Sequence, residues 1–286
     1  MAASRTETND GSSTTPSLDA TLRRIQAATG IIFSTFTVVH LCSWLLLHAG
    51  SFDAATKAMN FFRAYYQNPL VEPTLAASAA AHVSVSAWRV LRRSPASNNA
   101  TAKPSGGSQT SPTSPLVQDR LYHRYAGWIL TALVPVHVFA TRFNPYLALG
   151  AVESARIVGP HLASHVTVEQ PGVFLVYYAL LTTSGLFHTI AGLSYAFQAL
   201  KIRLPFPLSS LVSPTSLRLR QILLTTLSIS TVLALCGYYY PLTFTEEQEY
   251  AFHLLKNVQE VNGWRLVRLD WTPLGLLDGG WKRGSG

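Results

Sequence analysis

The sequence predicts an all-α membrane protein, a bundle of five transmembrane helices with a cytosolic N-terminus and a short C-terminal tail. The 286 residues are 48% hydrophobic and only 13% charged, whereas about a quarter of the residues of a soluble domain are charged. The charges leave five long stretches without Asp, Glu, Lys or Arg, and the basic residues lie mostly on one side of them. This composition argues against an ordinary soluble enzyme, a disordered chain and a disulfide-stabilised scaffold.

The five uncharged stretches are the predicted membrane spans, and they run Ile25–Phe52, Pro73–Trp88, Tyr125–Thr141, Gln170–Leu200 and Gln221–Thr245. A bilayer core of about 30 Å requires about 20 helical residues. The first, fourth and fifth stretches are long enough alone, and the other two gain length from flanking apolar residues. The second is built mainly on small residues, which let helices pack closely in lipid. We therefore expect an interior span there, with a buried soluble helix as the alternative.

The distribution of basic residues predicts the orientation in the membrane. The side that holds the N-terminus and the connections after spans two and four carries thirteen of the 22 Lys and Arg, and the two opposite loops carry four. Lys and Arg accumulate on the cytosolic side of membrane proteins, so the N-terminus should face the cytosol. Nucleic acid is not expected as a partner, because no folded face combines clustered basic residues with aromatic ones.

The chain divides into three parts: a disordered cytosolic N-terminus (1–22), a transmembrane domain (23–240) and a C-terminal tail (241–286). Within the transmembrane domain, residues 94–116 are rich in Ser, Thr, Pro and Gly, a composition typical of a flexible linker. We expect this linker on the cytosolic side.

The C-terminal tail carries a helix signal near its start. Thr245 is followed three residues later by Gln248, which is the spacing of a capping box, in which each side chain bonds the backbone N–H of the other residue. We therefore expect a short helix from there to about Val258.

Each of the first four predicted spans contains one histidine: His40, His82, His137 and His188. Ionisable side chains inside a membrane are rare and usually functional, and imidazole is a common axial ligand of haem iron. At about 1.5 Å per residue, His40 can face His137, and His82 can face His188. These positions permit two molecules of haem b, or one with two histidines left over. The alternative is that the histidines hydrogen-bond neighbouring helices.

A flat macrocycle needs space beside its ligands. Gly185 and Gly192 stand at i−3 and i+4 from His188, on the same helical face, and we expect them to provide that space. Gly127 lies about 80° round the helix from His137, so it should be at best a neighbour of that face.

Other basic residues are weaker candidates for the haem site. Arg24 and Arg124, at the cytosolic edge, could pair with haem propionates, or they could simply be topology-determining charges. The remaining histidines rank lower as ligands: His48 and His123 at span ends, His161 and His165 in a loop, and His253 in the tail. No nucleophile elbow, P-loop or dinucleotide fingerprint is present, so an enzyme is not expected, although redox work through a bound cofactor stays open.

At these positions the chain resembles the transmembrane domain of the fungal mitochondrial outer-membrane adapter family, the MCP family. The resemblance covers roughly Arg24 to Tyr240, with short motifs in matching order. The motifs are Thr29-Gly30 through His40-Leu41, Phe62-Arg63-Ala64-Tyr65-Tyr66-Gln67 with Pro69 and Glu72-Pro73, Ala81-His82-Val83-Ser84, Arg124-Tyr125-Ala126-Gly127-Trp128, Leu133-Val134-Pro135-Val136-His137 and Ser184-Gly185-Leu186-Phe187-His188.

The resemblance implies a five-span protein of the mitochondrial outer membrane that acts in lipid homeostasis. It implies recruitment of a bridge-like lipid-transfer protein of the vacuolar-sorting type to membrane contact sites. The domain is more distantly similar to the haem-binding membrane anchors of succinate dehydrogenase and fumarate reductase. By that likeness, the four histidines match haem-ligand positions.

One departure from the family concerns the recruiting segment. Family members use a cytosolic Pro-x-Pro segment near the N-terminus, where this chain has the single proline Pro16. The pair Pro205 and Pro207 has the right spacing in a later cytosolic loop, and Pro112 with Pro115 has the wrong spacing. Extended proline segments dock in grooves at low entropic cost, but a plain turn is the alternative for both pairs.

Two other functions compete with the adapter. A b-type cytochrome could anchor a redox partner or reduce a quinone, and this would draw on the same four histidines. A lipid scramblase would balance the leaflets of a membrane that receives transferred lipid, although no polar groove can be defined from the sequence.

Overall fold

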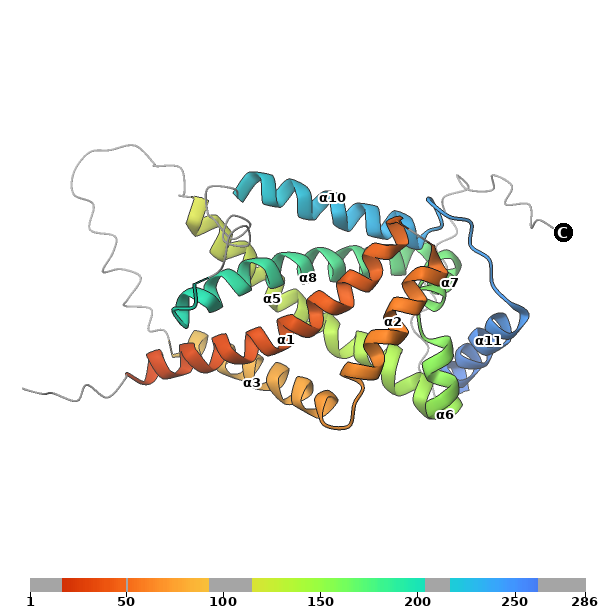
Figure 1. Cartoon of the computed structure of the whole chain (residues 1–286), viewed down its shortest axis with the longest axis horizontal. Coiled ribbons are helices and arrows are strands. Elements are labelled where there is room, and N and C mark those ends of the chain that lie inside the picture. Colours follow the sequence, from red (N-terminus) through yellow and green to blue (C-terminus); the bar gives the residue numbers. More distant parts are fainter. Residues whose placement is uncertain (1–16, 50, 93–114, 204–216, 262–286) are drawn as a thin grey trace, which may run out of the picture.

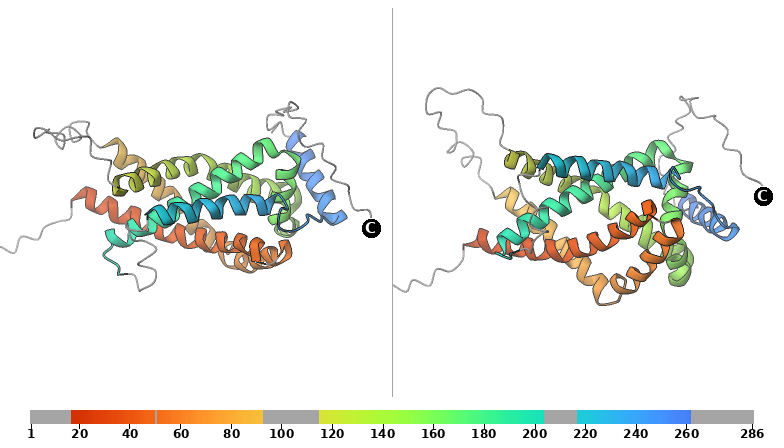
Figure 2. Two further views of the ribbon diagram at one scale, coloured as in Figure 1. Left: turned by 90° about the horizontal axis from the view of Figure 1, so that it is seen from above. Right: turned by 45° about the horizontal axis from the view of Figure 1, so that its top comes forward.

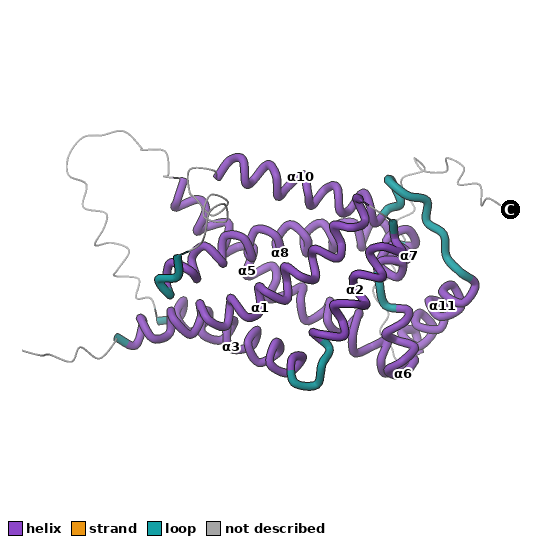
Figure 3. Tube along the Cα trace, viewed as in Figure 1, coloured by secondary structure: helices purple, strands orange, loops and turns teal. Residues whose placement is uncertain are grey.

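The computed structural model describes residues 17–49, 51–92, 115–203 and 217–261. Within these ranges the chain forms α-helices and one π-helical turn, and it forms no strand (Figure 3). The all-α prediction is therefore confirmed for the described part of the chain.

Long helices lie lengthwise beside one another and form the body of the molecule (Figures 1 and 2). They are α1 (Leu18–Ala49), α3 (Val71–Leu91), α5 (Pro115–Val138), α8 (Pro171–Ala199) and α10 (Leu217–Leu235). Helix α8 is central, because it packs against α1, α5 and α10, and α3 packs against α1. The buried positions of α8 are mostly small, among them Ser184, Gly185 and Ala191, and small residues allow this close packing.

Four segments are long and apolar enough to cross a membrane: Leu18–His48, Gln118–Ile157, Pro171–Ala199 and Arg218–Leu235. Only 6% to 33% of the residues in their most apolar windows are buried within the protein. So much outward apolar surface requires lipid around it, which supports a multi-pass membrane protein. The second predicted span does form α3, of 21 residues, but α3 is not among these four, because its alanine- and serine-rich sequence is less apolar.

The ends of several helices differ from the predicted spans. Helix α1 ends at Ala49 because Ser51 caps the next helix, α2 (Phe52–Tyr66), by accepting a 3.2 Å hydrogen bond from the amide of Ala54. The predicted fifth span was too long at its C-terminal end. Helix α10 stops at Leu235 because Gly237 takes a positive φ of 76°, the conformation that ends helices in a Schellman motif.

The third predicted span was too short. The helical segment that contains it runs on through the π-helical turn η1 (Phe139–Phe143) into α6 (Asn144–Ile157). Pro135 lies inside α5, and a proline within a helix removes one backbone hydrogen bond and bends the helix. Helix α6 is itself interrupted at Gly150, where φ is 79°.

Shorter helices gather at one end of the bundle (Figure 1). They are α2, α6, α7 (Pro160–Glu169) and α11 (Glu246–Val261). The predicted capping box of α11 is confirmed, because the amides and side chains of Thr245 and Gln248 exchange hydrogen bonds of 3.0 and 3.2 Å. Helix α11 packs on α6 through a small apolar core that includes Ile157 and Phe252.

Candidate functional site

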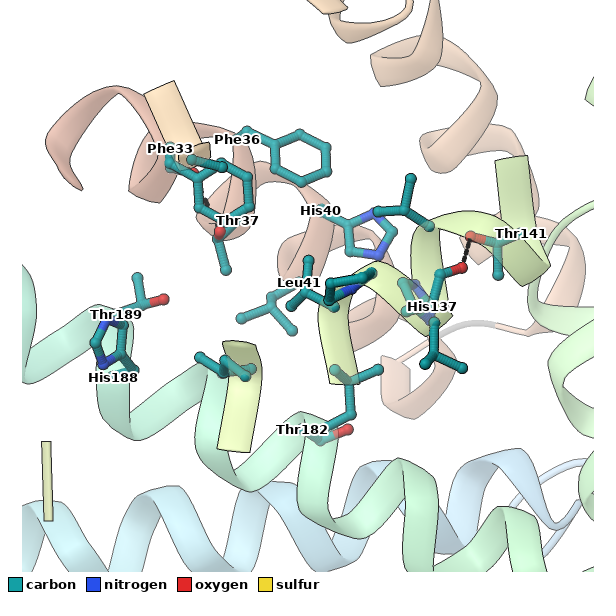
Figure 4. A pocket seen from close by; sticks show the side chains of 18 of the residues that line it. Phe33, Phe36, Thr37, His40, Leu41, His137, Thr141, Thr182, His188 and Thr189 are labelled. Atoms are coloured by element: carbon teal, nitrogen blue, oxygen red, sulfur yellow. Dashed lines mark hydrogen bonds between the residues drawn. The ribbon is translucent and has the colours of Figure 1, made fainter. Parts of the chain in front are cut away.

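A cavity of about 1830 Å³ runs between the long helices, and all four predicted histidines line it. Figure 4 shows His40, His137 and His188 around it. His40 comes from α1, His82 from α3, His137 from α5 and His188 from α8. Pockets for small ligands usually measure about 300–1,000 Å³. The cavity therefore has room for a large ligand or for more than one.

The histidines face one another in the predicted pairs. The ring centroids of His82 and His188 are 6.0 Å apart, and those of His40 and His137 are 6.3 Å apart. Two imidazoles that bind one metal ion from opposite sides, with bonds of about 2 Å each, have centroids roughly 6 Å apart. Each pair has therefore the spacing of a bis-histidine metal site.

The pair of His82 and His188 also has its ring orientation set by the backbone. Nδ1 of His82 lies 3.0 Å from the carbonyl oxygen of Gln26, and Nδ1 of His188 lies 3.0 Å from that of His123. Each Nδ1 donates its proton to a carbonyl, so each Nε2 is the nitrogen with a free lone pair. This arrangement is the usual outer support of a metal-binding histidine.

Glycines on the facing helices bring the backbone against these two rings. A Cβ on Gly30 of α1 would lie 3.0 Å from Cε1 of His82, and one on Gly127 of α5 would lie 2.8 Å from Cε1 of His188. Gly127 thus lies off the face of His137, as its position round the helix predicts, but the sequence did not predict its direct contact with His188. Gly185 meets open space, which leaves room beside His188.

His123 belongs to the site, although its position at the end of a predicted span made it a weak candidate ligand. Its ring stacks on that of His188 at 4.2 Å with an interplanar angle of 7°. Gly192, expected to leave space for a macrocycle, instead packs against His123, since a Cβ on Gly192 would lie 3.0 Å from Cε1 of His123. His123 precedes Gly127 by four residues, as His188 precedes Gly192, so α5 and α8 each present a histidine to the other's glycine. Sequence reasoning missed this signal.

The pair of His40 and His137 has different neighbours. Nδ1 of His137 lies 3.2 Å from the hydroxyl of Tyr177, and the carbonyl of His137 accepts a hydrogen bond from Thr141 (Figure 4). Nε2 of His40 accepts a 3.2 Å hydrogen bond from the indole of Trp44. In a neutral ring the proton is then on the buried Nδ1, which has no partner among the described residues, so His40 could bind iron through Nε2 only after its hydrogen bond from Trp44 is broken.

The two pairs lie at different levels of the cavity. Gly30, beside His82, and His40 are ten residues apart on α1, and Gly127, beside His188, and His137 are ten residues apart on α5. Ten helical residues rise about 15 Å. Helices α1 and α5 thus both place the pair of His40 and His137 about 15 Å from the pair of His82 and His188 along the bundle.

Arginines lie at the end of the cavity that is nearer to His82 and His188. Of the two predicted propionate partners, Arg124 lines the cavity and Arg24 does not. Arg89 lines it too, and it donates hydrogen bonds to Gln26 and, at 3.0 Å, to Asp19. This end of the cavity therefore suits the negative charge of carboxylates.

The donor set fits haem. A metal ion held by protein alone usually takes about three or four protein ligands, whereas the haem macrocycle leaves only axial positions to the protein. His82 and His188 offer two imidazoles with correctly held tautomers and backbone glycines alongside. His40 and His137 offer the same spacing, with Nε2 of His40 already engaged by Trp44.

The recruiting candidates Pro205, Pro207 and Pro112 lie outside the described residues. Comparisons with protein-family models, with curated proteins and with solved structures give no match. The likeness to the adapter family is carried by the sequence motifs alone.

Proposed function

We propose that this multi-pass membrane protein binds haem b between His82 and His188 and acts as an adapter in lipid homeostasis at the mitochondrial outer membrane. The observation that supports haem binding is the facing pair, whose two Nδ1 atoms are both held 3.0 Å from carbonyl oxygens. The adapter role is supported by the family resemblance of the sequence motifs.

When bound, haem b supplies a one-electron redox centre or a structural crosslink between helices. His82 and His188 would hold the iron from α3 and α8, and their carbonyl partners would keep each Nε2 free to bind it. Gly30 and Gly127 keep α1 and α5 close to the rings. Arg124 would neutralise a carboxylate at the cavity end.

The test is a reduced-minus-oxidised absorption spectrum of the detergent-purified protein, with haem quantified per chain. We expect a bis-histidine b-type spectrum that is lost in His82→Ala and in His188→Ala. His253→Ala is the matched control, because His253 is exposed on α11, away from the cavity. Protein that is made with ample haem and shows no such spectrum would refute haem binding and leave the histidines as interhelical packing residues.

The adapter proposal includes a five-span topology with the N-terminus in the cytosol. It also includes recruitment of a vacuolar-sorting-type lipid-transfer protein through the segment around Pro205 and Pro207. Affinity purification from mitochondria should recover that protein with the wild type but not with the double variant Pro205→Ala, Pro207→Ala. Equal recovery with both would exclude this segment as the docking site.

A second candidate function is electron transfer through two haems. It is favoured by the two histidine pairs, which lie at levels about 15 Å apart as measured along α1 and α5. A redox titration should then resolve two midpoint potentials, and His40→Ala should remove one of them. A single potential that is unchanged in His40→Ala would argue against this function.

A further inference from the structure

Helix α2 carries an arginine on its buried face. The buried residues of α2 are Phe52, Ala55, Met59, Arg63 and Tyr66, which recur at the spacing of one helical stripe. Arg63 is only 8% exposed. A permanent positive charge thus stands on the apolar face that α2 turns toward the bundle.

The partners of Arg63 are neutral. Its Nη1 donates to the carbonyl oxygen of Ala155 at 2.9 Å and to the amide oxygen of Asn60 at 3.2 Å. Its Nε is buried and has no acceptor among the described residues. Arginine keeps its charge in proteins, and a buried charge without a counter-ion is strongly unfavourable.

Glu72, a carboxylate that lines the same cavity, does not supply the missing charge. Glu72 accepts two hydrogen bonds, of 2.7 and 2.9 Å, from Arg142, a bidentate pairing that uses both of its oxygens. Arg142 adds a second positive charge near Arg63. This cluster of three residues has therefore a net positive charge.

Arg63 lines the cavity at the end that holds the pair of His40 and His137. Tyr66, one turn later on α2, packs edge-on against Phe36 at 5.1 Å and against His40 at 6.4 Å. Most side chains that line the cavity are apolar. A molecule that fits there combines an apolar body with an anionic group.

We propose that Arg63 binds an anionic oxygen group, a phosphate or a carboxylate, of an amphiphilic molecule held in the cavity. The guanidinium would then gain a charged acceptor for its orphaned Nε, in the geometry that arginine offers to such groups. The anionic group belongs either to the headgroup of an acidic phospholipid or to a haem held by the pair of His40 and His137. The phospholipid source does not depend on haem binding.

The probe is phosphatidic acid in nanodiscs of phosphatidylcholine, with retained phosphatidic acid measured per chain after detergent extraction and washing. Arg63→Gln should bind about tenfold less phosphatidic acid, since a hydrogen bond to a charged group is worth that much or more. Arg63→Lys, which keeps the charge but not the fork, should bind an intermediate amount. Arg156→Gln is the control, because Arg156 is exposed on α6 and does not line the cavity.

A second readout on the same samples separates the two sources. Loss of phosphatidic acid in Arg63→Gln with an unchanged haem spectrum and potential assigns the group to a phospholipid. Unchanged lipid binding with a shifted haem potential assigns it to the haem carboxylates. If Arg63→Gln matches Arg156→Gln in both readouts, while helix content and thermal midpoint equal those of the wild type, the anion site is refuted.

Discussion

Replacing Gly127 by alanine should weaken haem binding at the pair of His82 and His188. The added Cβ would stand 2.8 Å from Cε1 of His188, whereas ordinary contacts are 3.4–4 Å, so the imidazole must retreat by about 0.6 Å. A metal ligand displaced by that distance no longer meets the iron at bonding distance from both sides. The expected loss arises at the haem site and not from the helix, since alanine is a better helix former than glycine.

The imidazole of His188 has little freedom to retreat. It stacks at 4.2 Å on His123 and holds a 3.0 Å hydrogen bond to the carbonyl of the same residue. Breaking the hydrogen bond costs about 0.5–1.5 kcal/mol, and overpacking adds about 1–3 kcal/mol. The helix propensity of alanine returns about 1 kcal/mol. The remaining loss of about 0.5–3.5 kcal/mol corresponds to haem affinity about twofold to several-hundredfold lower.

The assay is a haem titration of the apo-protein followed by absorbance, run beside a thermal unfolding scan. Gly172→Ala is the matched control, because Gly172 lies on α8, does not line the cavity, and a Cβ there meets nothing within 4 Å. It should bind haem as the wild type does. The reasoning is refuted if Gly127→Ala binds equally well, or if Gly172→Ala loses as much affinity as Gly127→Ala.

Three further predictions follow from contacts elsewhere. Asp119 accepts hydrogen bonds from Tyr195 and from Arg220, and the side chain of Arg220 is 7% exposed. Because Asp119→Asn leaves the buried guanidinium without a counter-ion, it should destabilise the fold by about 3–5 kcal/mol. The thermal midpoint should fall accordingly, and adding Arg220→Met should partly restore it. Burial lowers the pKa of His165 on α7 below its ordinary value, so the packed state favours the neutral ring and stability falls as the pH drops below about 6.5. Helix α11 packs on that ring through Phe252 and His253, beside Phe244 of the preceding loop. Its hydrogen exchange should accelerate at low pH, against the opposing attraction of Glu169 and Glu249, and less so in His165→Phe. Thr245→Ala removes one half of the capping box and should cost about 1 kcal/mol, measured as faster exchange confined to the first turn of α11.

The pairing of the histidines could be predicted because depth along a helix depends only on residue count. His40 and His137 lie far apart in the sequence, yet equal distances from the membrane edge bring them to one level. Which nitrogen is free could not be predicted, since it depends on the carbonyl that each ring meets. The carbonyls of Gln26 and His123 reach His82 and His188 only after the helices have packed.

The sequence did not indicate the role of His123, because the uncharged stretch that marks the third span begins only at Tyr125. Helix α5 in fact begins at Pro115, well before the uncharged stretch, since charged residues near a membrane edge do not end a helix. The end of α10 was not predicted for another reason. Gly237 is a signal for the C-terminal end of a helix, but the uncharged stretch continues through it to Thr245.

The crossed arrangement of α5 and α8 has an evolutionary consequence. Each helix contributes a glycine that exists to accommodate the other helix's histidine: Gly127 with His188, and Gly192 with His123. A lineage that loses one of these histidines relieves the constraint on the opposite glycine, which is then free to drift toward alanine or serine for better helix propensity. Related sequences should therefore keep or lose the members of each couple together.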